Sequence, residues 1–342
     1  GNLAFTREGA HSRPRILFHE DITGKEITSK LLTQVKKRKN IQIHEFTTMT
    51  DIIVKNGKCA GIVAKTQDGE EMKIYAQDTI FASGGIGGRY QHSTNFPHLT
   101  GDALDISKKH GIRLEHLDYV QIHPTTLYSS KPGRRFLISE SVRGEGARLY
   151  DKNMNRFVNE LLPRDLLSQK IHEQMAKDDT DFVWEDLRTI PAETLRHHFP
   201  NIVEHCREMG YDVFKECIPV VPAQHYFMGG VKVDYQSRSS MENLYVVGEA
   251  ACNGVHGKNR LASNSLLESL VFARRAAQDM AEHDLKNASP QNAIEVADYL
   301  ASQVDFTPYQ NIQTLAKTYH HLATQAITIG QNPEGRKEFL YV

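Results

Sequence analysis

The stretch that most constrains this chain runs from residue 244 to residue 273, where an apolar run, a glycine-rich loop and a helical pattern follow one another. Residues 244–247 are apolar throughout, which is typical of a buried strand. Beyond the loop, Leu266, Leu270 and Val271 recur at the spacing of one helix face. The stretch therefore predicts a strand, a loop and a helix, in that order.

The start of the predicted helix has the features of an anion-binding site. Ser265 and Glu268 match the capping box, in which a serine caps the helix and a glutamate reaches back to the cap. The amides of a helix start attract electron-rich groups. Arg260 adds a permanent cation whose planar fork suits a carboxylate. An ordinary surface turn would explain the glycines and the cap, but not an arginine among small residues.

This loop carries a resemblance to a known family. Residues 256–268, with the sequence HGKNRLASNSLLE, closely resemble the carboxy-terminal FAD motif of the succinate dehydrogenase and fumarate reductase flavoprotein superfamily. Within the motif, Ala262 and Ser263 resemble the L-aspartate oxidase branch, because the respiratory dehydrogenases usually carry glycine at the first position. The resemblance implies that FAD is bound without a covalent link.

Composition excludes several other classes of protein. The 342 residues include 41 basic and 42 acidic side chains, a formal charge of −1, so no global field would recruit nucleic acid or a membrane surface. The four cysteines form no C-x-x-C pair, which argues against a disulfide framework, a zinc ribbon or an iron–sulfur cluster and favours a reducing cytoplasm. No H-E-x-x-H motif is present, and we expect no metal.

The first hundred residues predict one helix and then a run of strands. Apolar spacing favours a helix over residues 23–39. Asn-Gly and Asp-Gly pairs at residues 56–57 and 68–69 separate β-rich runs, which indicates an antiparallel meander. The runs expected as strands are residues 41–46, 52–54, 61–64 and 72–75.

A second glycine-rich loop follows a short strand at residues 78–82. It is not the dinucleotide phosphate loop, because Tyr90 stands where the third glycine of that motif belongs. In the resembled superfamily this loop passes beside the flavin, which makes Ala82, Ser83, Gly84 and Gly85 candidate cofactor contacts. A helix is expected to begin near residue 100 and to end at Gly111; Asp102 is either its cap or a ligand of the cofactor, and the two roles are compatible.

The resemblance also implies a division of the chain. The expected fold is α/β with α+β elements: a partial FAD-binding domain, an inserted capping domain and a truncated helical region. Residues 1–118 and 229–289 would form the FAD-binding domain, residues 119–228 the capping domain that holds substrate, and residues 290–342 the start of a C-terminal helical domain. Polar helices are expected there at residues 293–304 and 312–327.

Two histidine motifs predict where substrate binds. A lone histidine is most often structural, but here the surrounding residues match the family. The Gln-x-His-Pro-Thr motif at residues 121–125 and the motif around His225 imply contacts to the two ends of a dicarboxylate. The implied substrate-binding residues are Gln121, His123, Thr125, His225 and Arg260.

Arg164 resembles the catalytic arginine of the superfamily, where it transfers a proton. As a bare Arg-Asp pair it could equally be an exposed, ion-paired arginine. A guanidinium has a pKa above about 12, which opposes proton transfer. Desolvation beside other cations, namely His123, His225 and Arg260, would ease it.

Several further side chains have roles that only the resemblance implies. Glu140, Arg143 and Glu145 form either a proton relay or a structural ion network. Glu249 would hold the ribityl chain, and the amides of Ser265 and Leu266 would face the electron-rich edge of the flavin. Glu8 would recognise a substrate ammonium, which succinate lacks.

The implied reaction is the FAD-dependent oxidation of L-aspartate to iminoaspartate by hydride transfer from carbon 2 to flavin N5. Oxygen or fumarate would accept the electrons, and quinolinate synthase would use the product in NAD biosynthesis. One alternative is a fumarate reductase or succinate dehydrogenase flavoprotein subunit, and another is a non-catalytic flavoprotein-like binding module.

The family's G-x-G-x-x-G element, which binds the FAD pyrophosphate, is absent from these residues. We therefore expect the chain to be a fragment that alone binds FAD weakly or not at all and is inactive.

Overall fold

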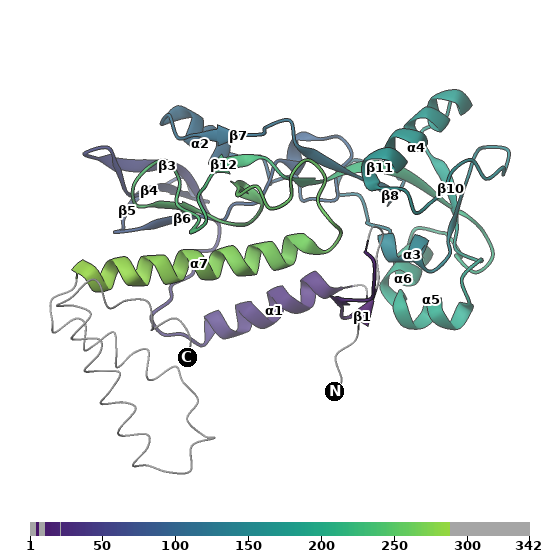
Figure 1. The fold of residues 1–342 in the computed structure, drawn as a ribbon, viewed down its shortest axis with the longest axis horizontal. Helices are drawn as coiled ribbons and strands as arrows, with labels where there is room; N and C mark the ends of the chain where they lie inside the picture. Colours follow the sequence, from purple (N-terminus) through teal and green to yellow (C-terminus); the bar gives the residue numbers. More distant parts are fainter. Residues whose placement is uncertain (1–4, 7–10, 21, 288–342) are drawn as a thin grey trace, which may run out of the picture. The chain divides into compact units, whose positions relative to one another are not determined.

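The computed structural model describes residues 5–6, 11–20 and 22–287 (Figure 1). The chain divides into two compact units, residues 1–273 and 274–342, and the site described below lies within the first. The last described helix, α7 (Asn264–Asn287), begins in the first unit and ends in the second. None of the helices within the described ranges is both long and apolar enough to cross a membrane.

The chain begins with a small hairpin and one helix. Strand β1 (Phe5–Thr6) pairs with β2 (Ile16–Leu17), and α1 (Thr23–Lys36) follows, which confirms the predicted helix. The strand expected at residues 41–46 is wrong. Phe46 has a positive φ of 54°, which interrupts extended backbone, and the strand starts immediately after it.

The antiparallel meander is confirmed. Strand β3 (Thr47–Lys55) pairs with β4 (Lys58–Thr66), which pairs with β5 (Glu71–Tyr75). Asn56 and Gly57 both have positive φ, as a tight hairpin turn requires. The strand edges approach closely at Gly61, where a Cβ atom would lie 2.0 Å from the Ile74 carbonyl oxygen.

Two small sheets join distant parts of the chain. Strand β6 (Thr79–Phe81) runs parallel to β13 (Leu244–Val246), and β12 (Gly230–Lys232) lies between β14 (Ala251–Cys252) and β7 (Leu114–Glu115). Helix α2 (Asp102–Lys109) and two short 3-10 turns, η1 (Gly87–Arg89) and η2 (Gly248–Ala250), accompany them. Since parallel strands end at the same sheet edge, the loops after β6 and β13 emerge together.

Residues 120–227 contain a four-stranded antiparallel sheet with the order β8-β11-β10-β9 (Figure 1). Its cluster of buried aliphatic side chains is separate from the cluster that underlies the two small sheets. The mixture of helix and sheet confirms the predicted fold class, and the polar helices expected beyond residue 290 lie outside the described residues. The elements of this region are β8 (Val120–Leu127), α3 (Glu140–Gly144), β9 (Arg148–Tyr150), α4 (Arg164–Asp178), β10 (Val183–Asp186), α5 (Ala192–His198), α6 (Pro200–Glu208) and β11 (Ile218–Phe227).

Helix α4 is held in place by its buried face. Leu167 is fully buried in the aliphatic cluster, whereas its neighbour Leu166 is 47% exposed. We expect Leu167→Ala to lower the free energy of unfolding by about 2–5 kcal/mol, because the cavity cannot fully collapse. Leu166→Ala, the matched control, should change it by about 0.5 kcal/mol or less. Urea unfolding of the full-length variants measures both values, and equal losses would contradict this packing.

The carboxyl group of Glu185 should make stability fall as pH rises. It is completely buried in β10, and neither oxygen has a hydrogen-bond partner within the described ranges. Burial raises its pKa from 4.5 to about 8. The unfolded chain therefore loses this proton first, and the free energy of unfolding decreases between those two pH values.

Glu185→Gln should remove this pH dependence. We expect the variant to gain stability relative to the parent when the pH is raised from about 5 to about 8, whereas the exposed Glu71→Gln should show no such gain. Thermal unfolding at the two pH values is the measurement. The buried, protonated state would be contradicted if Glu185→Gln and the parent differed in stability by the same amount at both pH values.

Candidate active site

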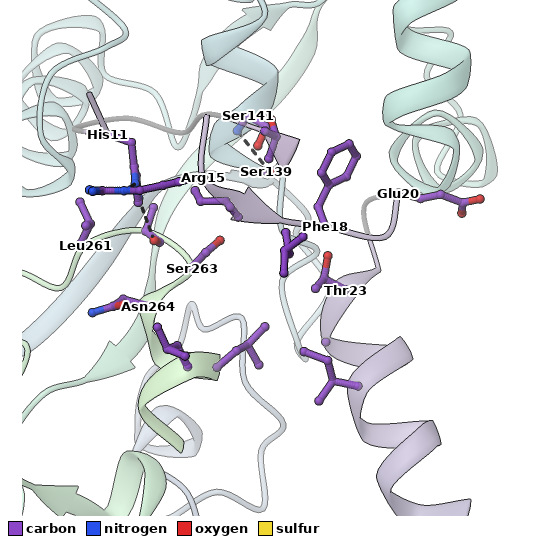
Figure 2. Close-up of a pocket in the computed structure, with 18 of the residues that line it drawn as sticks. His11, Arg15, Phe18, Glu20, Thr23, Ser139, Ser141, Leu261, Ser263 and Asn264 are labelled. Atoms are coloured by element: carbon purple, nitrogen blue, oxygen red, sulfur yellow. Dashed lines mark hydrogen bonds between the residues drawn. The ribbon is translucent and has the colours of Figure 1, made fainter. Parts of the chain in front are cut away.

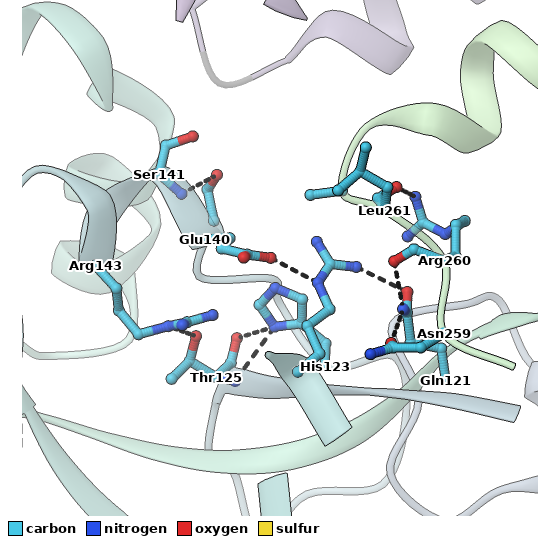
Figure 3. Close-up of polar contacts among 12 residues, drawn as sticks. Gln121, His123, Thr125, Glu140, Ser141, Arg143, Asn259, Arg260 and Leu261 are labelled. Carbon is cyan, nitrogen blue, oxygen red and sulfur yellow. Dashed lines mark hydrogen bonds and ion pairs between the residues drawn. The ribbon is translucent and has the colours of Figure 1, made fainter. Parts of the chain in front are cut away.

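Arg164 and Glu140 form a buried ion pair at the start of α4 (Figure 3). Nε of Arg164 donates to Oε2 of Glu140 at 2.6 Å, and Nη1 donates to Oε1 of Gln121 at 2.9 Å. The side chains of the pair are only 8% and 7% exposed, respectively. The simpler expectation of an exposed, ion-paired arginine is therefore wrong.

Gln121 connects this ion pair to the glycine-rich loop before α7. Its Nε2 donates to Oδ1 of Asn259 at 2.9 Å and to the carbonyl oxygen of Arg260 at 2.8 Å. Asn259 in turn donates to Oδ1 of Asp165 at 2.9 Å. One glutamine of β8 thus links α3, α4 and the loop, which are far apart in the sequence (Figure 3).

His123 and His225 lie on neighbouring strands with their ring centroids 5.2 Å apart. Nδ1 of His123 is 2.9 Å from the Thr125 carbonyl oxygen, while its Nε2 is buried with no partner among the described residues. Nδ1 of His225 lies 2.7 Å from Oγ1 of Thr94. Burial, and secondly the charge of Arg164, hold the pKa of both histidines well below 6.5.

The expected crowding of Arg164 by cations does not involve charged histidines, whereas Arg143 and Arg260 are both close enough to lower the pKa of its partner Glu140. The two histidines are neutral near neutral pH, because protonating a desolvated ring beside an arginine is costly. Glu140 supplies an opposite charge instead. Burial opposes its ionisation, but Arg164 and Arg143 outweigh burial and hold the pKa of Glu140 below its usual value.

Arg143 and Thr125 lie in the same buried region. Nη1 of Arg143 donates to the Glu160 carbonyl oxygen at 2.7 Å, and Nε approaches Oγ1 of Thr125 at 3.4 Å. The Thr125 hydroxyl donates to the carbonyl oxygen of Ile138 at 3.2 Å, so it is already engaged within the protein. Glu145 is apart from this group and pairs with His198 near the surface, at 3.4 Å.

Arg260 is buried, 4% exposed, in the loop that precedes α7. Its Nη1 donates to Oγ of Ser265 at 3.2 Å, and its guanidinium carbon lies 4.6 Å from the centroid of the Tyr226 ring. The predicted capping box is wrong. Ser265 lies inside α7 with its hydroxyl accepting from Arg260, and Glu268 turns toward Asn253 and Tyr226.

The predicted cofactor-binding residues gather where β6 and β13 end. A Cβ atom on Gly85 would lie 2.3 Å from Oε1 of Glu249, so any larger residue there would displace the Glu249 side chain. Glu249 accepts a hydrogen bond from the Phe227 amide at 2.8 Å, and burial raises its pKa to about 7. The hydroxyl of Ser83 is buried with no partner within the described part of the chain. Ala82 and Gly84 lie in the loop after β6, whereas Leu266 lies in the first turn of α7.

Asp102 is not the cap of α2. The cap residue is Gly101, with a left-handed φ of 81°, and Asp102 is the first helical residue. Oδ1 of Asp102 accepts a hydrogen bond from the Thr100 hydroxyl at 2.6 Å. Its other predicted role, as a cofactor ligand, stays a prediction.

A cavity of about 690 Å³ adjoins the buried network (Figure 2). It is lined by Ser139 and Ser141, which flank Glu140, and by residues 261–264, which follow Arg260. Nε2 of His11 lies 3.1 Å from the carbonyl oxygen of Ala262 and ties the N-terminal segment to that loop. Glu8 lies outside the described residues.

Sequence reasoning missed several of these contacts. Asn259 stands inside the motif at residues 256–268 and His11 lies three residues after Glu8, so both could have been singled out, whereas nothing in the sequence around Thr94 pointed to His225. In the described ranges, no three His, Cys, Asp or Glu side chains are grouped so as to hold a metal ion.

The chain is similar in sequence and in fold to several known proteins. L-aspartate oxidase from Clostridium perfringens is 52% identical over 81% of this chain and 63% of its own length. The enzyme from Neisseria meningitidis is 41% identical over 84% of this chain and 59% of its own length. A solved quinol–fumarate reductase with menaquinol molecules has a TM-score of 0.76 at 33% identity, covering 82% of this chain and 52% of that one.

The chain thus spans less than two thirds of the length of each of these relatives. A family model described as "FAD binding domain" matches residues 1–266. Because that match covers well over half of the 342 residues, this chain belongs to the FAD binding domain family.

Proposed function

We propose that the full-length protein oxidises L-aspartate to iminoaspartate with FAD as its cofactor. The observation that carries the proposal is the buried cluster in which Arg164, Arg260 and two neutral histidines converge from separate segments of the chain. The fixed positive charge of two buried guanidinium groups, with the planar fork that suits carboxylates, favours an anionic substrate that carries carboxylate groups.

The proposed contacts follow from the hydrogen-bond capacity that remains in the cluster. Nε2 of His123 is buried without a partner in the described ranges, so it can meet one end of the substrate. Arg260 and His225 would hold the carboxylates. Gln121 and Thr125 act indirectly in this account, since Gln121 orients Arg164 and the backbone of Thr125 contacts the ring of His123.

FAD fits the loops that follow β6 and β13. The hydroxyl of Ser83 offers an unused buried donor, and the side chain of Glu249 packs directly against the backbone of Gly85. We propose that Ala82, Ser83, Gly84, Gly85, Asp102, Glu249, Ser265 and Leu266 contact the cofactor. When bound, FAD supplies the acceptor for the hydride that leaves carbon 2 of the substrate.

Arg164 is the proposed proton-transfer residue. Oxidation of the amino acid releases a hydride from carbon 2 and one proton from the ammonium nitrogen. A guanidinium can take that proton only if it passes another on, and Glu140 accepts a hydrogen bond from Arg164 at 2.6 Å. The ion pair therefore supports a transfer in which Glu140 ends protonated while Arg164 keeps its charge.

Aspartate is preferred to succinate for two reasons. The relatives that are 52% and 41% identical to this chain over the aligned residues are named L-aspartate oxidases. Ala262 and Ser263 also match that branch, and Glu8 would bind the ammonium group. The 33% identity to a quinol–fumarate reductase supports the second candidate, a succinate- or fumarate-specific flavoprotein subunit.

The setting of the reaction is also proposed. Oxygen or fumarate would reoxidise the cofactor, and quinolinate synthase would consume the product. All four cysteines are free and buried, which supports a cytoplasmic location.

Flavin bleaching separates the two substrates. We expect L-aspartate, but not succinate, to bleach the flavin absorbance of the full-length protein under anaerobic conditions. The physical reason is that only aspartate carries the ammonium group that a carboxylate can recognise. Bleaching by succinate with no response to aspartate would exclude the leading proposal in favour of the second candidate.

Arg164→Lys should lower kcat/KM for aspartate by about 10²- to 10⁴-fold, the range typical of general acid–base residues. Lysine keeps the charge but lacks the planar fork that engages Glu140 and Gln121 together. The control is Arg196→Lys, because Arg196 is 59% exposed and lies on α5. Steady-state rates for both variants give the comparison. Equal activities of parent and Arg164→Lys would contradict the catalytic role of Arg164, and no activity in the parent itself would point to a non-catalytic binding module.

A further inference from the structure

Glu268 is a buried acid that the proposed reaction does not use. It lies on α7 and is 4% exposed. Oε2 accepts hydrogen bonds from the hydroxyls of Tyr226, at 3.3 Å, and of Ser269, at 3.4 Å, while Oε1 accepts from Nδ2 of Asn253. Burial raises its pKa, and the three donors oppose that rise. A carboxyl group so enclosed has a definite orientation.

Tyr226 connects Glu268 to Arg260. Its side chain is 7% exposed, and the guanidinium carbon of Arg260 lies 4.6 Å from the ring centroid. The ring of His256 meets the same ring edge-on at a centroid distance of 5.4 Å. A cation over an aromatic face is attracted to it, so the position of the ring influences the position of the guanidinium.

We propose that Glu268 is a positioning residue that fixes the hydroxyl of Tyr226. The Tyr226 ring is thereby held in place beneath Arg260 and orients its guanidinium toward a substrate carboxylate. The inference rests on the proposed function in one respect, namely that Arg260 binds a carboxylate. The contacts among the three side chains do not depend on it.

A role of Glu268 in hydrogen bonding to Tyr226 can be distinguished from a role in compensating the charge of Arg260. Tyr226 needs an acceptor oxygen, and the amide of glutamine provides one. If Glu268 acted by compensating the charge of Arg260, glutamine would be as harmful as alanine. If it acts by holding Tyr226, Glu268→Gln should restore most of what Glu268→Ala loses.

The test measures malonate binding by calorimetry together with aspartate kinetics, in the full-length holoprotein. We expect Glu268→Ala and Tyr226→Phe each to raise the malonate Kd and the aspartate KM about tenfold, with kcat changed about threefold or less, since one orienting hydrogen bond is lost. The double variant should bind malonate no more weakly than the weaker-binding of the two single variants. Glu282→Ala, an exposed glutamate on the same helix, is the control.

Three results would overturn the inference. They are a malonate Kd unchanged in Glu268→Ala, a Glu268→Gln variant that binds malonate as weakly as Glu268→Ala, or losses of malonate binding free energy that add in the double variant. Thermal midpoints are recorded in parallel to check that each variant is folded. If Glu268→Ala shows no folded transition, Glu268→Gln and Tyr226→Phe are compared instead. Equal malonate Kd values for these two variants would also contradict the proposal. If the parent binds malonate but does not oxidise aspartate, the proposed function fails while the Kd comparison still decides the role of Glu268.

Discussion

The buried ion pair between Arg164 and Glu140 is the interaction on which the site depends. Removing one partner of such a pair leaves an uncompensated buried charge, which typically costs about 3–5 kcal/mol. The fold therefore has to keep α3 and the start of α4 together. Gln121 extends the constraint to the glycine-rich loop, because its amide contacts Arg164 on one side and the backbone of Arg260 on the other.

Burial, together with the charge of Arg164, sets the protonation state of the two histidines. His123 and His225 are neutral because they are desolvated beside Arg164, so the fixed positive charge of the site comes from its arginines. A neutral imidazole offers either a donor or an acceptor, depending on its tautomer. The site can therefore bind an anionic substrate strongly without a pronounced dependence on histidine protonation.

Sequence reasoning recovered the elements whose signal is local. The meander around Asn56 and Gly57, the helix after residue 23 and the strand before the glycine-rich loop follow from turn chemistry and periodicity. The site residues came from motif resemblance, since nothing local brings His123 beside His225. Their pairing depends on the register of β8 with β11, which are separated by about ninety residues.

The errors have a common physical origin. The capping box at Ser265 failed because a tertiary contact with Arg260 takes its hydroxyl, and the histidines beside Arg164 are neutral rather than charged because they are buried. Both outcomes depend on which groups are desolvated, and a linear sequence does not specify that. The same holds for Glu185, a charged residue type that lies within an aliphatic core.

The most direct test of this account is a crystal structure of the full-length holoprotein with malonate bound. We predict that the carboxylates lie within hydrogen-bonding distance of Arg260 and His225, with His123 at one end of the ligand and the Arg164–Glu140 pair intact beside it. Malonate bound elsewhere, or Arg164 turned away from both Glu140 and the ligand, would contradict this account.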